Sequence, residues 1–491
     1  MTNNEDLGVL VPATQDGRRS SSTLGRAVVA DALREVDPAG ALDAEREKNW
    51  RKGYVGHFRR LLESGVVSRD AALKIAADGL HAVHERMRYR GADGTETALA
   101  DMATGSPRPP PGTVQIHGTG EPEPGFSLPV RGERLVGEAL SHQLDVWSTA
   151  GVLEPSAADQ IRTLLAHPDW LRLDGQTIVV LGAGAEMGPL AHLLRWGARV
   201  AALELPRPEL WHGLITAATG AAGTLLAPVG DDSAGADAAA HAGLDVLSET
   251  AAATEWINHL DGALVLGNYV YADGVANLRL AAAVDALTLR LQDTRTDLAL
   301  AFLGTPTDVF AVPADAVAQS MRAHRDRSTR AKLLAAPLRA LSAGRLLRPQ
   351  YPSGPQPGIH DALIPQQGPN YALAKRLHRW RATVARDAGS TVSMNIAPPT
   401  GTRSVVKNRA LAAAYAEAHR FGVEVFEPAT ASTLMAGLLV ADLHTGGGPS
   451  HGNPWQDEAS GAVHGGLWRG PYQPRSALGL AAVMGYRAAK P

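Results

Sequence analysis

Apolar residues follow one period before residue 172 of this chain and a different one after it. In the first part, large apolar side chains recur every three or four residues, which is the buried stripe of a helix. One such stripe consists of Trp50, Tyr54, Phe58, Leu61 and Leu62. Ser68 precedes another stripe and suits the N-cap of a helix, and a helix pair is expected over about 132–166. The pattern predicts a mainly helical N-terminal region over residues 25–171.

Beyond residue 172, short and continuous apolar runs alternate with helical stretches. The runs occupy residues 177–181, 199–203, 262–266 and 298–303, and a helix is expected near 275–291. Strands that are apolar on both faces are typical of a parallel sheet covered by helices on both sides. We therefore expect an α/β fold, in which a doubly wound parallel Rossmann-like sheet occupies about residues 172–430.

Polar, glycine-rich and proline-rich segments flank or interrupt these two regions. Residues 1–24 are polar and turn-rich and predict a flexible tail. Residues 91–125 lose the helical period and contain Pro/Gly-rich stretches, which indicate a stiff and solvated linker. Residues 308–369 form an insertion within the α/β domain, and residues 431–491 form a C-terminal extension.

A glycine-rich turn follows the first strand of the expected sheet. Gly182, Gly184 and Gly188 stand between this strand and a helix, where a tight turn brings backbone N–H groups to a pyrophosphate. The next strand ends in Glu204, an acid that can accept hydrogen bonds from ribose hydroxyls and so favours NAD over NADP. A glycine turn that only packs a helix on a strand gives the same pattern.

Tyr371 and Lys375 lie one helical turn apart and therefore on one face of a helix. A lysine ammonium beside a phenol stabilises the phenolate and lowers the pKa of the tyrosine. Such a pair can exchange a proton with a carbonyl oxygen near neutral pH. The spacing also fits an exposed helix whose tyrosine packs on a neighbouring element.

The order of these motifs resembles that of the short-chain dehydrogenase/reductase family over about residues 175–405. Besides the glycine turn and the tyrosine–lysine pair, further positions are similar to that family's cofactor-binding segments: Asp245, Val246, Asn268, Pro398 and Thr400. The resemblance implies an NAD(P)-binding Rossmann domain, which transfers a hydride between its cofactor and a small-molecule carbonyl or alcohol. It also leaves room for a homo-oligomer, since dimers and tetramers are usual in that family.

The chain departs from the family's pattern at two places. Leu181 and Glu186 replace a threonine and the middle glycine of the glycine turn, and a carboxylate there repels a pyrophosphate unless it turns away. The family's catalytic serine has no direct counterpart before Tyr371. Thr305 and Thr307, at the end of a strand, are the candidates to polarise the carbonyl.

Composition narrows the classes of partner. The 47 Lys+Arg against 50 Asp+Glu leave no concentrated basic surface, which argues against nucleic-acid binding. The absence of cysteine excludes disulfides, thiol nucleophiles and cysteine-ligated zinc. His81, His84 and Glu85 share a helix face, but their arginine-rich surroundings favour a solvated face over a metal site. No long apolar stretch or signal-peptide pattern occurs, so we expect a cytoplasmic protein without a membrane partner.

Three functions fit these observations. The first is an NAD(P)-dependent oxidoreductase that interconverts a carbonyl and an alcohol, with Tyr371, Lys375 and Thr305 or Thr307 as its catalytic residues. The second is an S-adenosylmethionine-dependent methyltransferase, which explains the glycine turn and Glu204 but leaves the tyrosine–lysine pair without a role. The third is a non-catalytic nucleotide-binding scaffold or sensor, in which the altered glycine turn has lost tight cofactor binding.

Overall fold

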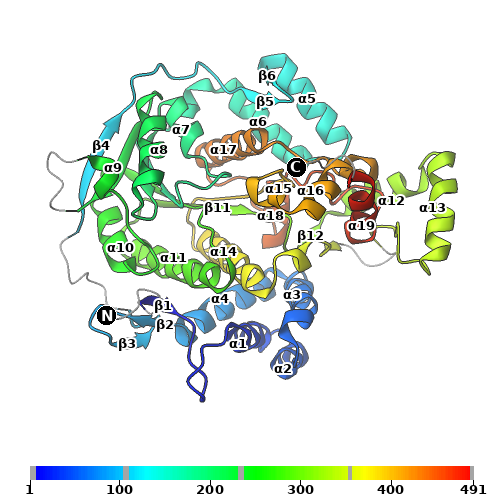
Figure 1. Cartoon of the computed structure of the whole chain (residues 1–491), viewed down its shortest axis with the longest axis horizontal. Coiled ribbons are helices and arrows are strands. Elements are labelled where there is room, and N and C mark those ends of the chain that lie inside the picture. Colours follow the sequence, from blue (N-terminus) through cyan, green and yellow to red (C-terminus); the bar gives the residue numbers. More distant parts are fainter. Residues whose placement is uncertain (1–6, 103–109, 231–236, 352–356, 487–491) are drawn as a thin grey trace.

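A seven-stranded sheet forms the centre of the computed structural model, which describes residues 7–102, 110–230, 237–351 and 357–486. Helices cover this sheet on both faces (Figure 1). Its strands, in spatial order, are β14 (Val392–Ile396), β11 (Leu298–Gly304), β10 (Ala263–Asn268), β7 (Gln176–Leu181), β8 (Arg199–Leu203), β9 (Thr224–Val229) and β4 (Gly112–His117). All neighbours pair in parallel except β4, which is antiparallel to β9. The chain runs outward from β7 in one direction and from β10 in the other, so the doubly wound Rossmann-like fold is confirmed.

Each face of the sheet has its own apolar core, because side chains of alternate residues point to opposite faces. Ile178, Val180 and Val200 pack under one set of helices. That set comprises α6 (Pro155–Ala166), α7 (Leu190–Trp196), α8 (Pro208–Thr219) and α17 (Pro428–His444). Val179 and Leu181 face the other set, which comprises α10 (Thr250–Asn258), α11 (Gly274–Thr294) and α14 (Pro369–Asp387).

The edge strand β4 lies inside the segment that was expected to be a linker, so that expectation is wrong for residues 112–117. Its residues alternate in polarity, and Val114 and Ile116 pack against the core while their neighbours face solvent. The strand pairs with β9 from Gly112 to His117. Proline and glycine on both sides hide this short alternation, and pairing with a strand more than 100 residues away stabilises it.

The first described residues are also more ordered than the sequence suggests. Residues 8–10 form β1 (Gly8–Leu10), which pairs with β2 (Arg88–Arg90), and β3 (Glu96–Ala98) completes this small sheet. Val9 is fully buried, and its N–H donates to the carbonyl of Leu247 at 3.2 Å. The prediction of a flexible tail over residues 1–24 is therefore wrong from residue 8 onward, because this apolar strand finds a partner surface.

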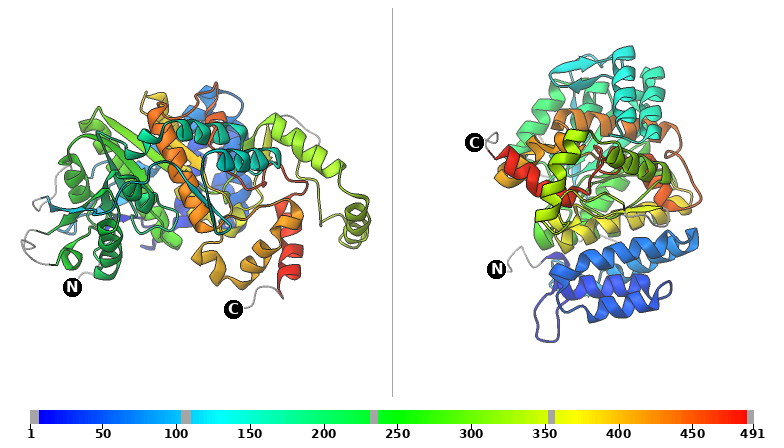
Figure 2. Two further views of the ribbon diagram at one scale, coloured as in Figure 1. Left: turned by 90° about the horizontal axis from the view of Figure 1, so that it is seen from above. Right: turned by 90° about the vertical axis from the view of Figure 1, so that its right-hand side faces the viewer.

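The predicted N-terminal helices form a layer against α14 and α11 (Figure 2). They are α1 (Ser21–Leu33), α2 (Pro38–Arg46), α3 (Trp50–Gly65) and α4 (Arg69–Arg86). Ser68 caps α4 by accepting the N–H of Ala71, as expected. His84 is not on a solvated face: it is buried, with Nε2 2.7 Å from Asp285 of α11. Among the described residues, no group of acidic and histidine side chains is arranged to hold a metal ion.

The remaining elements surround the sheet. Before it come β5 (Leu128–Val130), β6 (Glu133–Leu135) and α5 (Gly137–Thr149), and α9 (Ala238–His241) follows β9. The insertion contains β12 (Phe310–Val312), α12 (Ala314–Arg325), α13 (Thr329–Leu341) and β13 (Gly358–His360). The C-terminal part contains α15 (Arg403–Lys407), α16 (Arg409–Ala416), α18 (Pro454–Ser460) and α19 (Pro474–Gly485). The expected boundary at residue 430 lies inside α17, which packs on β14. None of the described helices is long and apolar enough to cross a membrane.

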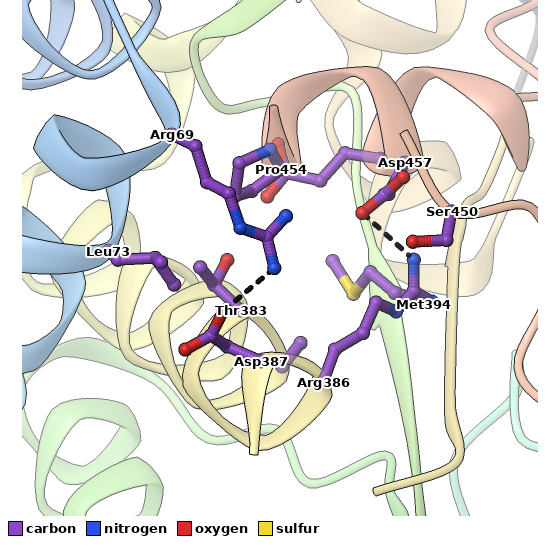
Figure 3. A pocket seen from close by; sticks show the side chains of 11 residues that line it. Arg69, Leu73, Thr383, Arg386, Asp387, Met394, Ser450, Pro454 and Asp457 are labelled. Atoms are coloured by element: carbon purple, nitrogen blue, oxygen red, sulfur yellow. Dashed lines mark hydrogen bonds and ion pairs between the residues drawn. The ribbon is translucent and has the colours of Figure 1, made fainter. Parts of the chain in front are cut away.

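Two ion pairs connect α14 to the helices on either side of it. Arg69 of α4 pairs with Asp387 at the end of α14 at 2.7 Å, and Arg386 lies 3.4 Å from Asp457 of α18 (Figure 3). These contacts line a hollow between α4, α14, β14 and α18.

A buried set of contacts connects residues 464–469 to Glu154, the N-cap of α6. His464 is fully buried and its Nε2–H donates to Glu154 at 2.9 Å, because its Nδ1 accepts the N–H of Gly466. Arg469 also donates to Glu154, from Nε at 2.8 Å. The segment around residue 464 is therefore part of the core.

Candidate active site

The candidate site lies along the carboxyl ends of the parallel strands. The sheet reverses its winding between β7 and β10, and ligands of open α/β sheets bind beside such a switch point. Gly182 follows β7, Asn268 ends β10 and Thr305 follows β11, so the parallel pairing places these three residues at the same edge. The topology alone thus brings three sequence-predicted residues together.

The glycine turn packs directly against the exit of β10. Gly182 has φ +76°, and a Cβ there would lie 3.0 Å from the backbone of Tyr269 and Val270, so only glycine fits. The N–H of Gly184 donates to Glu204 Oε2 at 2.8 Å. Glu204, the acid predicted at the end of the second strand, therefore hydrogen-bonds to the glycine turn itself. Gly188 is two residues before the start of α7.

Asp245 and Val246 lie in the segment next to this acid. The N–H of Leu244 donates to the backbone oxygen of Glu204 at 3.0 Å, which brings their segment across the end of β8. Val246 is buried, and Asp245 Oδ1 accepts the N–H of Leu247 at 3.0 Å. The side chain of Asp245 thus shapes a turn.

Asn268 has a buried acceptor without a partner. Only 3% of the residue is exposed, and its Oδ1 has no hydrogen bond to any described residue. Leu181 of β7 and Phe302 of β11 flank it in the sheet. Since an unpaired buried polar atom costs about 1–3 kcal/mol, this amide marks a place where a polar ligand group or water is needed.

Three hydroxyl groups lie together at the end of β11, the strand that pairs with β10 and Asn268. Thr305 Oγ1 lies 3.0 Å from Tyr371 Oη and 3.0 Å from Thr307 Oγ1. Tyr371 is in the first turn of α14 and is 9% exposed, whereas the threonines follow β11. The structure therefore brings together the residues that the sequence suggested for polarising and protonating a carbonyl oxygen.

Lys375 lies behind this group, with its Nζ 5.9 Å from the centre of the Tyr371 ring and donating to the Leu303 carbonyl at 3.4 Å. Burial raises the pKa of Tyr371, although hydrogen bonds from Thr305 and Thr307 oppose the rise. Burial also lowers the pKa of Lys375 to about 8. The expectation that the lysine lowers the tyrosine pKa is thus wrong here, because loss of solvent outweighs an ammonium that makes no direct contact with the phenol.

Hydrogen bonds among its own residues and to Phe426 fix the segment 398–401 after β14. The Thr400 hydroxyl donates to the Pro398 carbonyl at 2.9 Å. The N–H of Gly401 donates to the carbonyl of Phe426, and the N–H of Phe426 donates to the carbonyl of Pro399. Pro398 and Thr400 therefore belong to a fixed turn after β14, the outermost strand on this side of the sheet.

Glu186 connects the glycine turn to the start of α15. Its Oε2 accepts the N–H of Arg403, the first residue of α15, at 3.0 Å, and lies 3.8 Å from the Nε of the same residue. The carboxylate therefore does not turn out into solvent but spans the gap between residues 182–188 and the start of α15. This placement is unfavourable for a diphosphate in that gap.

Two neighbours of the hydroxyl group were not singled out in the sequence. The Tyr271 ring lies 6.3 Å from that of Tyr371 and is 54% exposed, so it lies on the solvent side of the buried phenol. Asp308 directly follows Thr307 and binds two arginines of α14. The signals were present: an aromatic residue shortly after a strand-end asparagine, and a lone acid facing Arg376 and Arg379 at helical spacing.

Comparisons with known proteins found similar solved structures but no matching family model. No family model matches the chain, and no curated protein matches it. A solved structure described as an A1-type ketoreductase is similar at 16% identity and a TM-score of 0.31, over 55% of this chain and 47% of that chain, about half its length. A short-chain dehydrogenase/reductase from Serratia marcescens BCRC 10948 is similar at 17% identity and a TM-score of 0.29, over 60% of this chain and 99% of that chain. The chain is thus similar, at low identity, to short-chain dehydrogenase/reductase structures.

Proposed function

We propose that the protein is an NAD(P)-dependent oxidoreductase that interconverts a small-molecule carbonyl and the matching alcohol. The observation that carries this proposal is the 3.0 Å contact between the Thr305 and Tyr371 hydroxyls at the carboxyl edge of the sheet. A carbonyl oxygen placed beside this pair would accept a hydrogen bond from each hydroxyl, once both protons turn from their mutual contact toward it. Two such donors stabilise the negative charge that develops on that oxygen during reduction.

Tyr371 is the proton donor in this proposal. Because burial raises its pKa, the residue is a neutral phenol at physiological pH and has a proton to give. Lys375 has a pKa lowered to about 8 but still carries its proton in most molecules near pH 7. Its ammonium lies 5.9 Å from the centre of the Tyr371 ring and makes no direct contact with the hydroxyl, so its part in this proposal is to hold the cofactor, while Thr305 keeps the phenol in place.

The residues at the edge fit a nicotinamide dinucleotide in part. The unpaired Oδ1 of Asn268 offers an acceptor, and the turn at Gly182 allows close approach. Glu204 accepts the N–H groups of Gly184 and Leu205, and the remaining lone pairs of its carboxylate suit ribose hydroxyls. When bound, this cofactor supplies or accepts the hydride. Glu204 also repels a 2′-phosphate, so we propose a preference for NAD(H), although Arg207 three residues later favours the phosphate.

Thermal shift with NADH, NADPH and S-adenosylmethionine tests the proposal. A ligand at a hundredfold excess over its Kd stabilises the folded protein by about 2.7 kcal/mol. We expect NADH to raise Tm most and a carbonyl panel to give NADH oxidation that Tyr371→Phe abolishes. Stabilisation by S-adenosylmethionine alone would instead identify a methyltransferase, and stronger stabilisation by NADPH would overturn the cofactor preference.

The Glu186–Arg403 contact favours a second candidate, a non-catalytic nucleotide-binding scaffold or sensor. A carboxylate between the glycine turn and α15 weakens binding of a diphosphate. If neither nicotinamide cofactor stabilises the wild type while both stabilise Glu186→Gln, this candidate replaces the oxidoreductase.

A further inference from the structure

A buried ion-pair network begins directly beside the hydroxyl group. Asp308 is 1% exposed and accepts hydrogen bonds from Arg376 at 3.0 Å and from Arg379 at 2.6 Å, both from α14. The same two arginines also donate to the carbonyl of Val309, at 3.4 and 2.8 Å. Asp308 Oδ1 in turn accepts the N–H of Val309 at 2.7 Å. Four bonds thus join this short stretch after β11 to one face of the helix.

The two elements joined by this connection also carry the reacting hydroxyls. Asp308 follows Thr305 by three residues, and Arg376 follows Tyr371 by five residues in α14. The hydroxyl contact between Thr305 and Tyr371 spans the same two elements, β11 and α14. Any sliding of α14 along β11 would therefore have to break the arginine bonds first.

We propose that Asp308 is a positioning residue that fixes Thr305 against Tyr371 by clamping the turn after β11 to α14. Asp308 touches neither reacting hydroxyl itself. The inference rests on the proposed function, because it assigns a purpose to the distance between those hydroxyls.

Charge balance explains why an ion pair serves this purpose better than apolar packing. Arg379 has a second acid, Glu458 of α18, at 2.7 Å, so two guanidiniums face two carboxylates in the buried network. A buried charge that loses its partner is costly, so displaced arrangements are penalised strongly. Apolar side chains would tolerate small shifts with little loss.

The same helix offers a matched control. Asp285 of α11 is buried and accepts two bonds from Arg381 of α14, at 2.7 and 2.8 Å, and His84 lies 2.7 Å away. Asp285→Asn therefore breaks a comparable ion pair on α14 without touching the turn after β11. Both variants lower Tm, and only Asp308→Asn is expected to disturb the hydroxyl contact.

Two readouts test the proposal on the full-length protein. The chain has nine tyrosines, so 3-fluorotyrosine labelling followed by ¹⁹F NMR reports on Tyr371, whose resonance is assigned by its loss in Tyr371→Phe. We expect Asp308→Asn to shift or broaden this resonance and Asp285→Asn to leave it in place. In turnover, Asp308→Asn should lower kcat by about 100-fold at an unchanged Kd for NADH, since an error of about 1 Å costs that much.

Arg376→Lys keeps the charge but loses the forked bonds, and it serves if Asp308→Asn does not fold. It should shift the Tyr371 resonance and lower kcat by about tenfold. An unmoved Tyr371 resonance in the folded variants, or equal shifts in Asp308→Asn and Asp285→Asn, overturns the proposal. A shift confined to the Asp308 and Arg376 variants in a protein without turnover supports the clamp and refutes only the oxidoreductase.

Discussion

Replacing Asp442 by asparagine is expected to stabilise the protein at neutral pH. Asp442 lies in α17 beneath β14 and is 3% exposed. Its Oδ2 accepts hydrogen bonds from Ser393 and Asn395 at 2.7 Å each, and its Oδ1 accepts one from Gln160 at 2.9 Å. Burial nevertheless raises the pKa of this carboxyl to about 6, against the opposing effect of these bonds and of Arg386.

The magnitude follows from proton linkage. An aspartate in the unfolded chain has a pKa of about 3.9, so the folded state holds the Asp442 proton over about two further pH units. Between about pH 4 and pH 6 the folded state therefore binds more protons than the unfolded state, and raising the pH favours unfolding. About 3 kcal/mol of stability is lost across this window and stays lost above it.

Asparagine removes this loss because it does not ionise. Its amide oxygen replaces Oδ2 and still accepts from Ser393 and Asn395. Its NH₂ group replaces Oδ1 and faces Gln160, whose Oε1 is buried without a partner and can accept once the Gln160 amide turns over. The turned Gln160 Nε2 then takes the place of the unpartnered Oε1, so the number of unpaired polar atoms does not rise.

Scanning calorimetry at about pH 4.5 and about pH 7.5 measures the effect. With an unfolding entropy of about 2 cal/mol/K per residue, a gain of about 3 kcal/mol raises Tm by about 3 °C in a chain of this length. The rise should occur at the higher pH and shrink at the lower one. Asp285→Asn is the opposite control, because its partners hold the pKa of Asp285 below the ordinary range. A lower Tm for Asp442→Asn at about pH 7.5, or the same difference at both pH values, would refute the reasoning.

Three further substitutions address the site. Tyr371→Phe should lower kcat by about 10²–10⁴-fold with the Kd for NADH unchanged, measured by NADH oxidation with Tyr415→Phe of α16 as control; retained turnover would exclude Tyr371 as the proton donor. Lys375→Met should lower kcat and also weaken NADH binding in calorimetric titration, and an effect on neither would remove the lysine from the site. Glu186→Gln should tighten NADH binding by about tenfold, since one opposing charge is lost, and weaker binding would mean that the contact with Arg403 builds the site.

Most of the sheet follows from local sequence because its central strands are buried on both faces. Residues 177–181 and 298–303 are continuous apolar runs, which have no stable place outside such a sheet. β9 lacks this signal, since Thr224–Val229 contains Pro228, and β4 is recognisable only beside β9. The positions of β9 and β4 therefore depend on pairing between distant strands, which the local sequence pattern does not show.

In the candidate site, too, local features could be predicted from the sequence, whereas contacts between distant residues could not. The spacing of Tyr371 and Lys375 is a property of one helix and can be read directly. The bond between Glu186 and Arg403 joins residues 217 positions apart, and Asp308 meets Arg376 across 68 positions. Neither contact leaves a periodic trace in the sequence, so the altered glycine turn was recognised but its partner was not. The raised pKa of Tyr371 likewise depends on how deeply the finished fold buries it.

The buried bond between Glu154 and His464 also sets the order in which the protein can be completed on the ribosome. The two residues are 310 positions apart. At about 5–20 residues per second, Glu154 is synthesised roughly 15–60 s before the imidazole that will pair with it. During that interval a carboxylate destined for the interior has neither His464 nor Arg469, and it stays in contact with water. The buried contact at the start of α6 is therefore completed only after residues 464–469 have been synthesised.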